Sequence, residues 1–246
     1  MLPPSTVSTC TRGARRDNRA TFNYQGSPLN KLRLIKTLAA IGLATSAASS
    51  FAGRPLLVDD AGVNKKGEGH IETWITRADG DNAFTVSPAY AFWDTVELAG
   101  AYTHFDTAGA RLYSLQAKWM ITPSQDHGCN FAAAVVGSRF ESDVGNGDAS
   151  TVTGLFSCNG NPFGNIHINL GYTKPSGASG DTSYGVAIEK SFGVLTPHVE
   201  LVGSDNTDSI VNLGLRGDIA RNVQLDGSIG RQSGINIYTV GLKFRF

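Results

Sequence analysis

The feature that most constrains this chain is an alternation of apolar and polar residues, which recurs in short segments from residue 70 to the C-terminus. In the clearest segment, residues 165–173, Ile166 and Ile168 share one face while His167 and Asn169 share the other. A repeat of two is the side-chain period of a β-strand. No apolar stripe with helical spacing competes with it. The chain is therefore expected to be all-β.

The alternating segments are separated by clusters of Gly, Asn, Asp, Ser and Pro, which favour turns. Their apolar faces tend to end in aromatic residues, as in transmembrane barrels, where aromatic residues lie at both membrane interfaces. We expect an antiparallel transmembrane β-barrel of about twelve strands, with ten or fourteen as the nearest alternatives. The expected strands are residues 69–77, 83–92, 95–105, 111–121, 129–140, 150–158, 165–173, 182–192, 196–204, 209–218, 223–231 and 235–246.

The N-terminal region has the features of an export signal. Lys31, Arg33 and Lys36 precede an apolar run over residues 38–48, and Ser50-Phe51-Ala52 has the small residues of a cleavage site. We expect a signal peptide at residues 31–52, cleaved after Ala52. A transmembrane anchor is the alternative, but the run is shorter than the ~20 residues that span a bilayer. Residues 1–30 do not fit ahead of a signal peptide and are expected to be untranslated or disordered.

The last expected strand ends in an aromatic residue at the chain terminus. Its apolar residues occupy alternate positions, namely Tyr238, Val240, Leu242, Phe244 and Phe246. This pattern resembles the C-terminal signal by which bacterial outer-membrane barrels are recognised for insertion. The resemblance implies the bacterial outer membrane, with its lipids and the barrel-assembly machinery as partners. A soluble β-sandwich is the alternative, because its strands also alternate.

Two cysteines follow the expected cleavage site, Cys129 and Cys158. An exported chain matures in an oxidising compartment. The two residues are placed symmetrically about the expected hairpin between residues 129–140 and 150–158, so they face each other across it. We predict that they form a disulfide at the periplasmic end of the hairpin. The alternative is a pair of free thiols.

If the apolar faces contact lipid, the alternate positions face the lumen and carry charges of both signs. Either these residues form a filled, structural interior or they line a selective conduit. A metal or acid/base site at His198 and Glu200 is disfavoured, because a strand commonly places two polar residues on one face. The expected lumen residues are Glu72, Glu97, Lys118, His167, Glu189, His198, Glu200, Arg216, Asp226 and Lys243.

The charge and residue content also exclude several functions. Residues 53–246 carry more Asp and Glu than Lys and Arg, which disfavours nucleic acid as a partner. A lipid-modifying outer-membrane enzyme would need a serine, a histidine and an orienting partner together. Only His104, near one strand end, is a weak candidate. We therefore expect no enzyme, no metal and no cofactor.

The segment before the first strand reads Arg54-Pro55-Leu56-Leu57-Val58-Asp59-Asp60-Ala61-Gly62. It resembles the opening of the meta-pathway phenol-degradation family of outer-membrane proteins, with Val58 where that family often has Thr. The resemblance implies a barrel associated with the passage of small hydrophobic or aromatic molecules. It implies no catalytic residues.

Residues 53–68 are expected to be periplasmic, and Asp59 and Asp60 form an acidic pair within them. The segment either folds back into the barrel as a plug, paired with Lys118, Arg216 or Lys243, or forms a mobile tail. The expected function is an outer-membrane conduit or passive transporter for small molecules. A structural barrel and, less favoured, a lipid-modifying enzyme are the alternatives.

Overall fold

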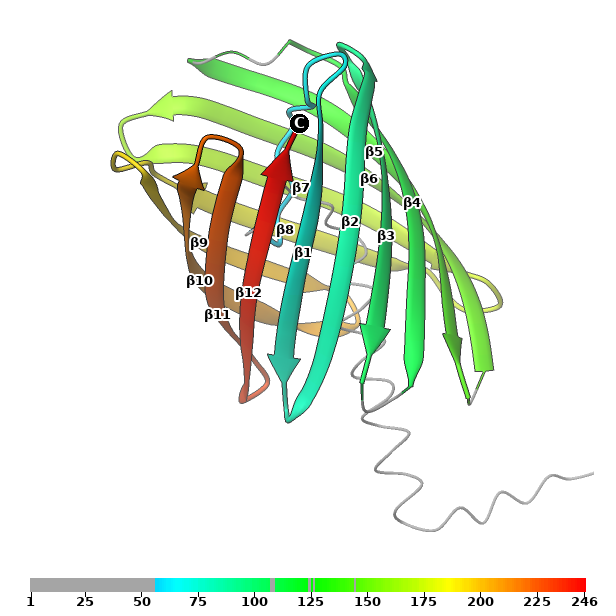
Figure 1. Cartoon of the computed structure of the whole chain (residues 1–246). Coiled ribbons are helices and arrows are strands. Elements are labelled where there is room, and N and C mark those ends of the chain that lie inside the picture. Colours follow the sequence, from blue (N-terminus) through cyan, green and yellow to red (C-terminus); the bar gives the residue numbers. More distant parts are fainter. Residues whose placement is uncertain (1–55, 107–108, 124, 126, 144) are drawn as a thin grey trace, which may run out of the picture. The chain divides into compact units, whose positions relative to one another are not determined.

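A computed structural model describes residues 56–246, except residues 107, 108, 124, 126 and 144. The expected signal peptide and residues 1–30 lie outside the described residues. Twelve antiparallel strands form a closed barrel in which β1 pairs with β12 (Figure 1). The strands are β1 (Gly69–Ala78), β2 (Asp81–Trp93), β3 (Val96–Phe105), β4 (Ala110–Met120), β5 (Gly128–Ser142), β6 (Gly145–Asn161), β7 (Gly164–Pro175), β8 (Asp181–Glu189), β9 (Leu195–Ser204), β10 (Thr207–Ala220), β11 (Val223–Gln232) and β12 (Ile235–Arg245).

The predicted barrel and its twelve strands are confirmed. The largest difference is at the β5–β6 hairpin, where the sequence predicts a loop over residues 141–149. The strands instead continue to Ser142 and Gly145, which pair with each other. The start of β6 is Gly-Asn-Gly-Asp, which has no apolar stripe. Backbone pairing extends this hairpin, together with a hydrogen bond from Ser142 Oγ to the Gly145 carbonyl at 2.9 Å, so apolar alternation could not reveal it.

Two ends of the barrel are distinguished by the chain termini. We call the end where β1 begins and β12 finishes the terminal mouth, and the opposite end the distal mouth. Phe246 and Gly69 exchange backbone hydrogen bonds at the terminal mouth. The sequence predicts that this end of the barrel faces the periplasm.

The outer surface of the barrel is apolar. Leu115 is 74% exposed, whereas its neighbour Gln116 is only 4% exposed, so the apolar face of β4 points away from the barrel axis. The same holds for the predicted insertion signal: Tyr238, Val240, Leu242, Phe244 and Phe246 are all exposed. A surface this apolar requires lipid around it. None of the described residues belongs to a helix that is long and apolar enough to cross a membrane.

The predicted disulfide is confirmed. Cys129 on β5 and Cys158 on β6 are bonded and lie directly opposite each other in the register. The bond lies near the terminal mouth, because Cys129 is the second residue of β5. The strands of this hairpin already pair along their whole length. The disulfide therefore stabilises the barrel mainly by restricting the unfolded chain.

We expect the variant Cys129→Ser to insert and fold but to unfold at a lower temperature. A disulfide that spans 29 residues reduces the entropy of the unfolded chain by an amount worth about 3–4 kcal/mol. The heat-dependent gel shift of the folded barrel measures this loss. The wild-type barrel with its disulfide reduced is the matched control and should show the same lowered transition. An unchanged transition in Cys129→Ser would contradict this role.

Candidate functional site

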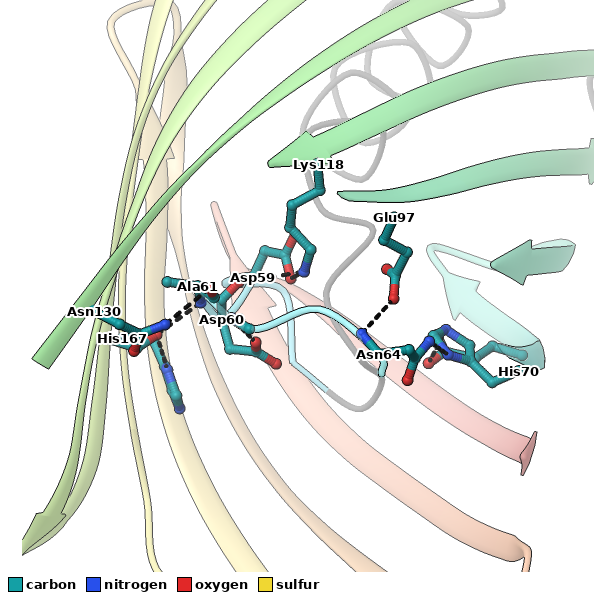
Figure 2. Close-up of polar contacts among 12 residues, drawn as sticks. Asp59, Asp60, Ala61, Asn64, His70, Glu97, Lys118, Asn130 and His167 are labelled. Carbon is teal, nitrogen blue, oxygen red and sulfur yellow. Dashed lines mark hydrogen bonds and ion pairs between the residues drawn. The ribbon is translucent and has the colours of Figure 1, made fainter. Parts of the chain in front are cut away.

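The interior of the barrel holds part of its own chain. Residues 56–64, here called the lumen segment, lie inside the barrel and run from its interior toward the terminal mouth (Figure 1). Side chains from several strands converge on this segment, as Figure 2 shows for Asp59, Ala61 and Asn64. Leu56, Val58 and Ala61 are at most 3% exposed. This cluster of contacts is the candidate functional site.

A buried ion pair lies at the centre of the site. Lys118 Nζ on β4 is 2.9 Å from Asp59 Oδ1, and it also donates to the Asp60 carbonyl oxygen at 3.3 Å. Both charged side chains of the pair are almost fully buried. Of the three cations that the sequence offers as partners, the structure places Lys118 against the segment. Lys243 and Arg216 pair with Glu72 and Glu189 instead.

The two carboxylates of the segment differ in their protonation behaviour. Burial raises the pKa of Asp59 from its ordinary value of 3.8 to about 7, although Lys118 opposes the shift. Burial also disfavours ionisation of Asp60, but Lys118 and His167 outweigh it and hold the pKa of Asp60 below its ordinary value. Asp60 Oδ1 also accepts a hydrogen bond from the Gly62 N–H at 2.6 Å. Asp59 is therefore the group of this segment that titrates near neutral pH.

Lumen side chains also bind the backbone of the segment. Glu200 Oε2 on β9 accepts hydrogen bonds from the N–H groups of Leu57 and Val58, the latter at 2.8 Å. Asn169 on β7, with its amide oriented so that donors meet acceptors, accepts from the Asp59 N–H at 2.7 Å. It donates to the Asp59 carbonyl at 2.8 Å. Asn169 thus binds both backbone polar groups of one residue, as a neighbouring strand would.

Ala61, further along the segment, is bound by side chains of β5 and β6. Ser157 Oγ accepts from the Ala61 N–H at 2.8 Å, and Asn130 Nδ2 donates to the Ala61 carbonyl at 2.9 Å. Ser157 Oγ also lies 2.8 Å from His167 Nδ1 (Figure 2 labels Asn130 and His167). Near the terminal mouth, the Asn64 N–H donates to Glu97 Oε2 at 3.0 Å.

Apolar contacts fix the deep end of the segment. Leu56 and Val58 form a buried cluster with Ala187 on β8 and Val202 on β9. Gly185 provides the space for Val58, because a Cβ atom at Gly185 would lie 2.9 Å from Val58 Cγ2. The glycine therefore forms a notch that fits the valine side chain.

The remaining predicted lumen residues all face the interior. Glu72 is bound by Lys243 Nζ at 2.9 Å, and Glu189 by an Arg216 guanidinium nitrogen at 2.8 Å. His198 Nε2 lies 3.6 Å from Glu200 Oε1, and Asp226 is 3% exposed on β11. Among the described residues, the buried charged side chains of the strands lie at mid-strand or nearer the terminal mouth.

The distal half of the lumen has a different character. Beyond the mid-strand residues Asn212 and Glu200, the buried polar side chains described in this half are hydroxyls. They include the hydrogen-bonded pairs Thr85–Thr103 and Thr151–Thr173. Phe105 and Leu112 form an apolar cluster there, against which Phe140 packs. Among the described residues, buried charges are thus found where the lumen segment lies and not toward the distal mouth.

Sequence reasoning did not single out Asn130, Ser157 or Gly185 as site residues. The predicted hairpin register places Asn130 opposite Ser157, and the structure has this pairing. That register, together with their inward positions, was an available signal. The role of Gly185 gave no signal, because it depends on a contact with Val58 that is remote in sequence.

Two chemical functions find little support in the site. Within the described part of the chain, no three His, Cys, Asp or Glu side chains are grouped so as to hold a metal ion. Ser157, His167 and Glu189 form a series of polar contacts of the kind that a hydrolytic enzyme uses. Ser157 Oγ contacts His167 Nδ1, and His167 Nε2 lies 3.6 Å from Glu189 Oε1. However, Ser157 Oγ is engaged by the Ala61 N–H, and Glu189 by Arg216. These residues hold the segment and the wall together. His104, the weak candidate from the sequence, lies on β3 near the distal mouth, 3.8 Å from Asp106.

The family of the chain follows from a match over most of its length. The family model described as Uncharacterised conserved protein UCP029691 matches residues 39–246. The chain belongs to this family. A comparison with curated proteins gave no match. The family that matches is not the phenol-degradation family that the opening residues resemble, so that resemblance stays a prediction.

Solved structures of similar fold include two porins and an outer-membrane protein. The KdgM porin, in a structure with disordered oligogalacturonate, has a TM-score of 0.57 at 15% identity, covering 72% of this chain and 99% of that one. The NanC porin has 0.54 at 10%, covering 71% and 98%. Omp33 of Acinetobacter baumannii has 0.53 at 10%, covering 73% and 98%. These likenesses show a shared fold, a closed antiparallel β-barrel, to which the apolar outer surface of this chain corresponds.

Proposed function

We propose that the protein is a passive outer-membrane conduit for small molecules and that the lumen segment is its plug. The observation that carries the proposal is the way the segment is held. Its contacts with the wall are side-chain contacts at Lys118, Glu200 and Asn169. The barrel closes through β1 and β12 without it. The segment can therefore leave without breaking a strand pair.

The side chains in the distal half of the lumen favour uncharged molecules, including aromatic ones, as the solutes. Hydroxyl groups and the cluster around Phe105 and Leu112 suit a solute with an apolar ring and few polar groups. The resemblance of residues 54–62 to the phenol-degradation family supports the same class. The absence of buried charges among the described residues of that half favours uncharged molecules over ions.

A filled structural barrel is the second candidate, and the occupied lumen favours it. Planar-bilayer recordings separate the two. A conduit should give discrete current steps, and an added phenolic solute should alter them. A filled barrel should give no steps even when the gel shift shows that it is folded. Expression that changes the lipid profile of the host would instead indicate a lipid-modifying enzyme.

The plug should open more often as the pH rises from 5 to 8. Asp59 has a pKa of about 7 when docked and 3.8 ordinarily, so the docked state binds the proton more tightly. Docking is then strongest below about pH 4 and weakens as the pH rises through 7. Lys118, Asp60 and Glu97 are the charged groups that act on Asp59.

Open probability in planar bilayers measures this dependence, and Asp59→Asn is the control that isolates Asp59 from the lumen histidines. The variant should lose the rise with pH. An equally steep profile in Asp59→Asn would assign the dependence to other groups.

A further inference from the structure

The wall of the lumen binds the plug as it would bind an extended peptide. Every residue from Leu57 to Ala61 has at least one backbone group hydrogen-bonded to a lumen side chain. Glu200, Asn169, Ser157 and Asn130 supply most of these bonds. Each of these four side chains is itself at most 8% exposed. Bonds to backbone groups are available to any peptide and do not depend on its sequence.

Two positions of the bound segment are recognised by their side chains. Val58 occupies the notch at Gly185, where it packs against Ala187 and Val202. The next residue, Asp59, pairs with the buried Lys118. An apolar side chain and an acidic side chain are therefore read one after the other, on either side of one peptide bond.

The orientation of these groups also fixes the direction in which a bound peptide runs. Asn169 binds the N–H and the carbonyl of the acidic residue, while Glu200 binds the N–H of the apolar residue before it. The chain direction is thus set from apolar to acidic. A reversed sequence would place its carboxylate in the Val58 notch, away from Lys118, and would leave a buried charge unpaired.

We propose that the lumen is a binding site for short extended peptides in which an apolar residue is followed by an acidic one. Residues 57–61 occupy this site as an internal competitor. The inference rests on the proposed function, because a peptide can bind only where the plug can leave. It adds a ligand class to the small apolar solutes.

The test uses the full chain with Asp59→Lys. This substitution places a second positive charge beside Lys118, which repels the plug, and it leaves every residue of the lumen wall unchanged. The probe is a fluorescent peptide Ala-Ala-Val-Asp-Ala-Ala, and binding is measured by anisotropy on folded protein in detergent. The variant should bind it at least about tenfold more tightly than the wild-type chain, whose own plug competes. Peptides with Asn for Asp, or with Val and Asp exchanged, should bind at least about tenfold more weakly.

A lumen control locates the binding. Adding Gly185→Ala to Asp59→Lys fills the notch and should weaken binding of the Val-Asp peptide, whereas adding Gly137→Ala should not, because nothing lies near a Cβ atom at Gly137. If Asp59→Lys lowers the folded yield, the pair Val58→Ala and Asp59→Ala vacates the same site. Equal binding of the Asp and Asn peptides, or no binding by a folded variant, would overturn the proposal.

Current recordings on the same preparations separate this proposal from the proposed function. A variant that conducts but binds no peptide leaves the conduit in place and refutes the peptide site. A variant that binds the peptide but never conducts supports the peptide site and refutes the conduit.

Discussion

Lys118→Met is expected to convert the mostly closed barrel into one that conducts. The substitution removes the cation that lies 2.9 Å from Asp59 in the buried pair. At about pH 8, where Asp59 with its pKa of about 7 is ionised in the wild-type chain, removing one member of a buried ion pair typically costs about 3–5 kcal/mol, because the other charge is left buried without a partner. The docked plug should therefore be disfavoured by roughly 150- to 4,000-fold relative to the undocked plug. Single-channel open probability measures the change.

A double variant distinguishes loss of the plug from damage to the barrel. Lys118→Met with Asp59→Leu removes both charges and leaves an apolar contact, which is often neutral or stabilising. Closure should return in the double variant. The heat-dependent gel shift should be the same in all three proteins, since the pair does not join two strands. A double variant that conducts as freely as Lys118→Met would show that Lys118 supports the wall rather than the plug.

The fold could be predicted because a barrel is encoded in local alternation. Each strand must place apolar side chains toward lipid. The alternation in the sequence therefore predicts that Leu115 faces outward and Gln116 inward, as they do. The cysteine pair could be predicted for the same reason, since hairpin symmetry fixes the register. The hairpin tip between Ser142 and Gly145 could not, because it lies where lipid no longer imposes the alternation.

The site could be predicted only in part, because its contacts join residues far apart in sequence. Inward positions identify Lys118, Lys243 and Arg216 equally well as partners for the acidic pair. Which cation meets Asp59 depends on the path of residues 56–64 through the lumen, and periodicity carries no information about that path. The amide of Asn169 and the notch at Gly185 have the same origin. A strand pattern reports which face a residue is on, and not what lies opposite.

Gly185→Ala is expected to release the plug without changing any charge. The added Cβ atom would lie 2.9 Å from Val58 Cγ2, closer than such atoms can approach, and 3.7 Å from Val202 Cγ2. Overpacking of this kind typically costs about 1–3 kcal/mol. The plug is the part that can yield, since β8 is paired on both sides with β7 and β9. The ratio of open to closed states should therefore rise roughly 5- to 150-fold.

Two further variants test whether the effect passes through Val58. Val58→Ala removes the methyl group that the new Cβ atom would meet, so the pair Gly185→Ala and Val58→Ala should close more often than Gly185→Ala alone. Gly137→Ala adds the same atom to β5, where nothing lies within 4 Å, and should leave the open probability unchanged. Because Lys118 and Asp59 are intact in all of these proteins, a rise in Gly185→Ala that Val58→Ala reverses assigns the closed state to shape as well as charge. A rise that Val58→Ala leaves in place would mean that β8 itself has moved.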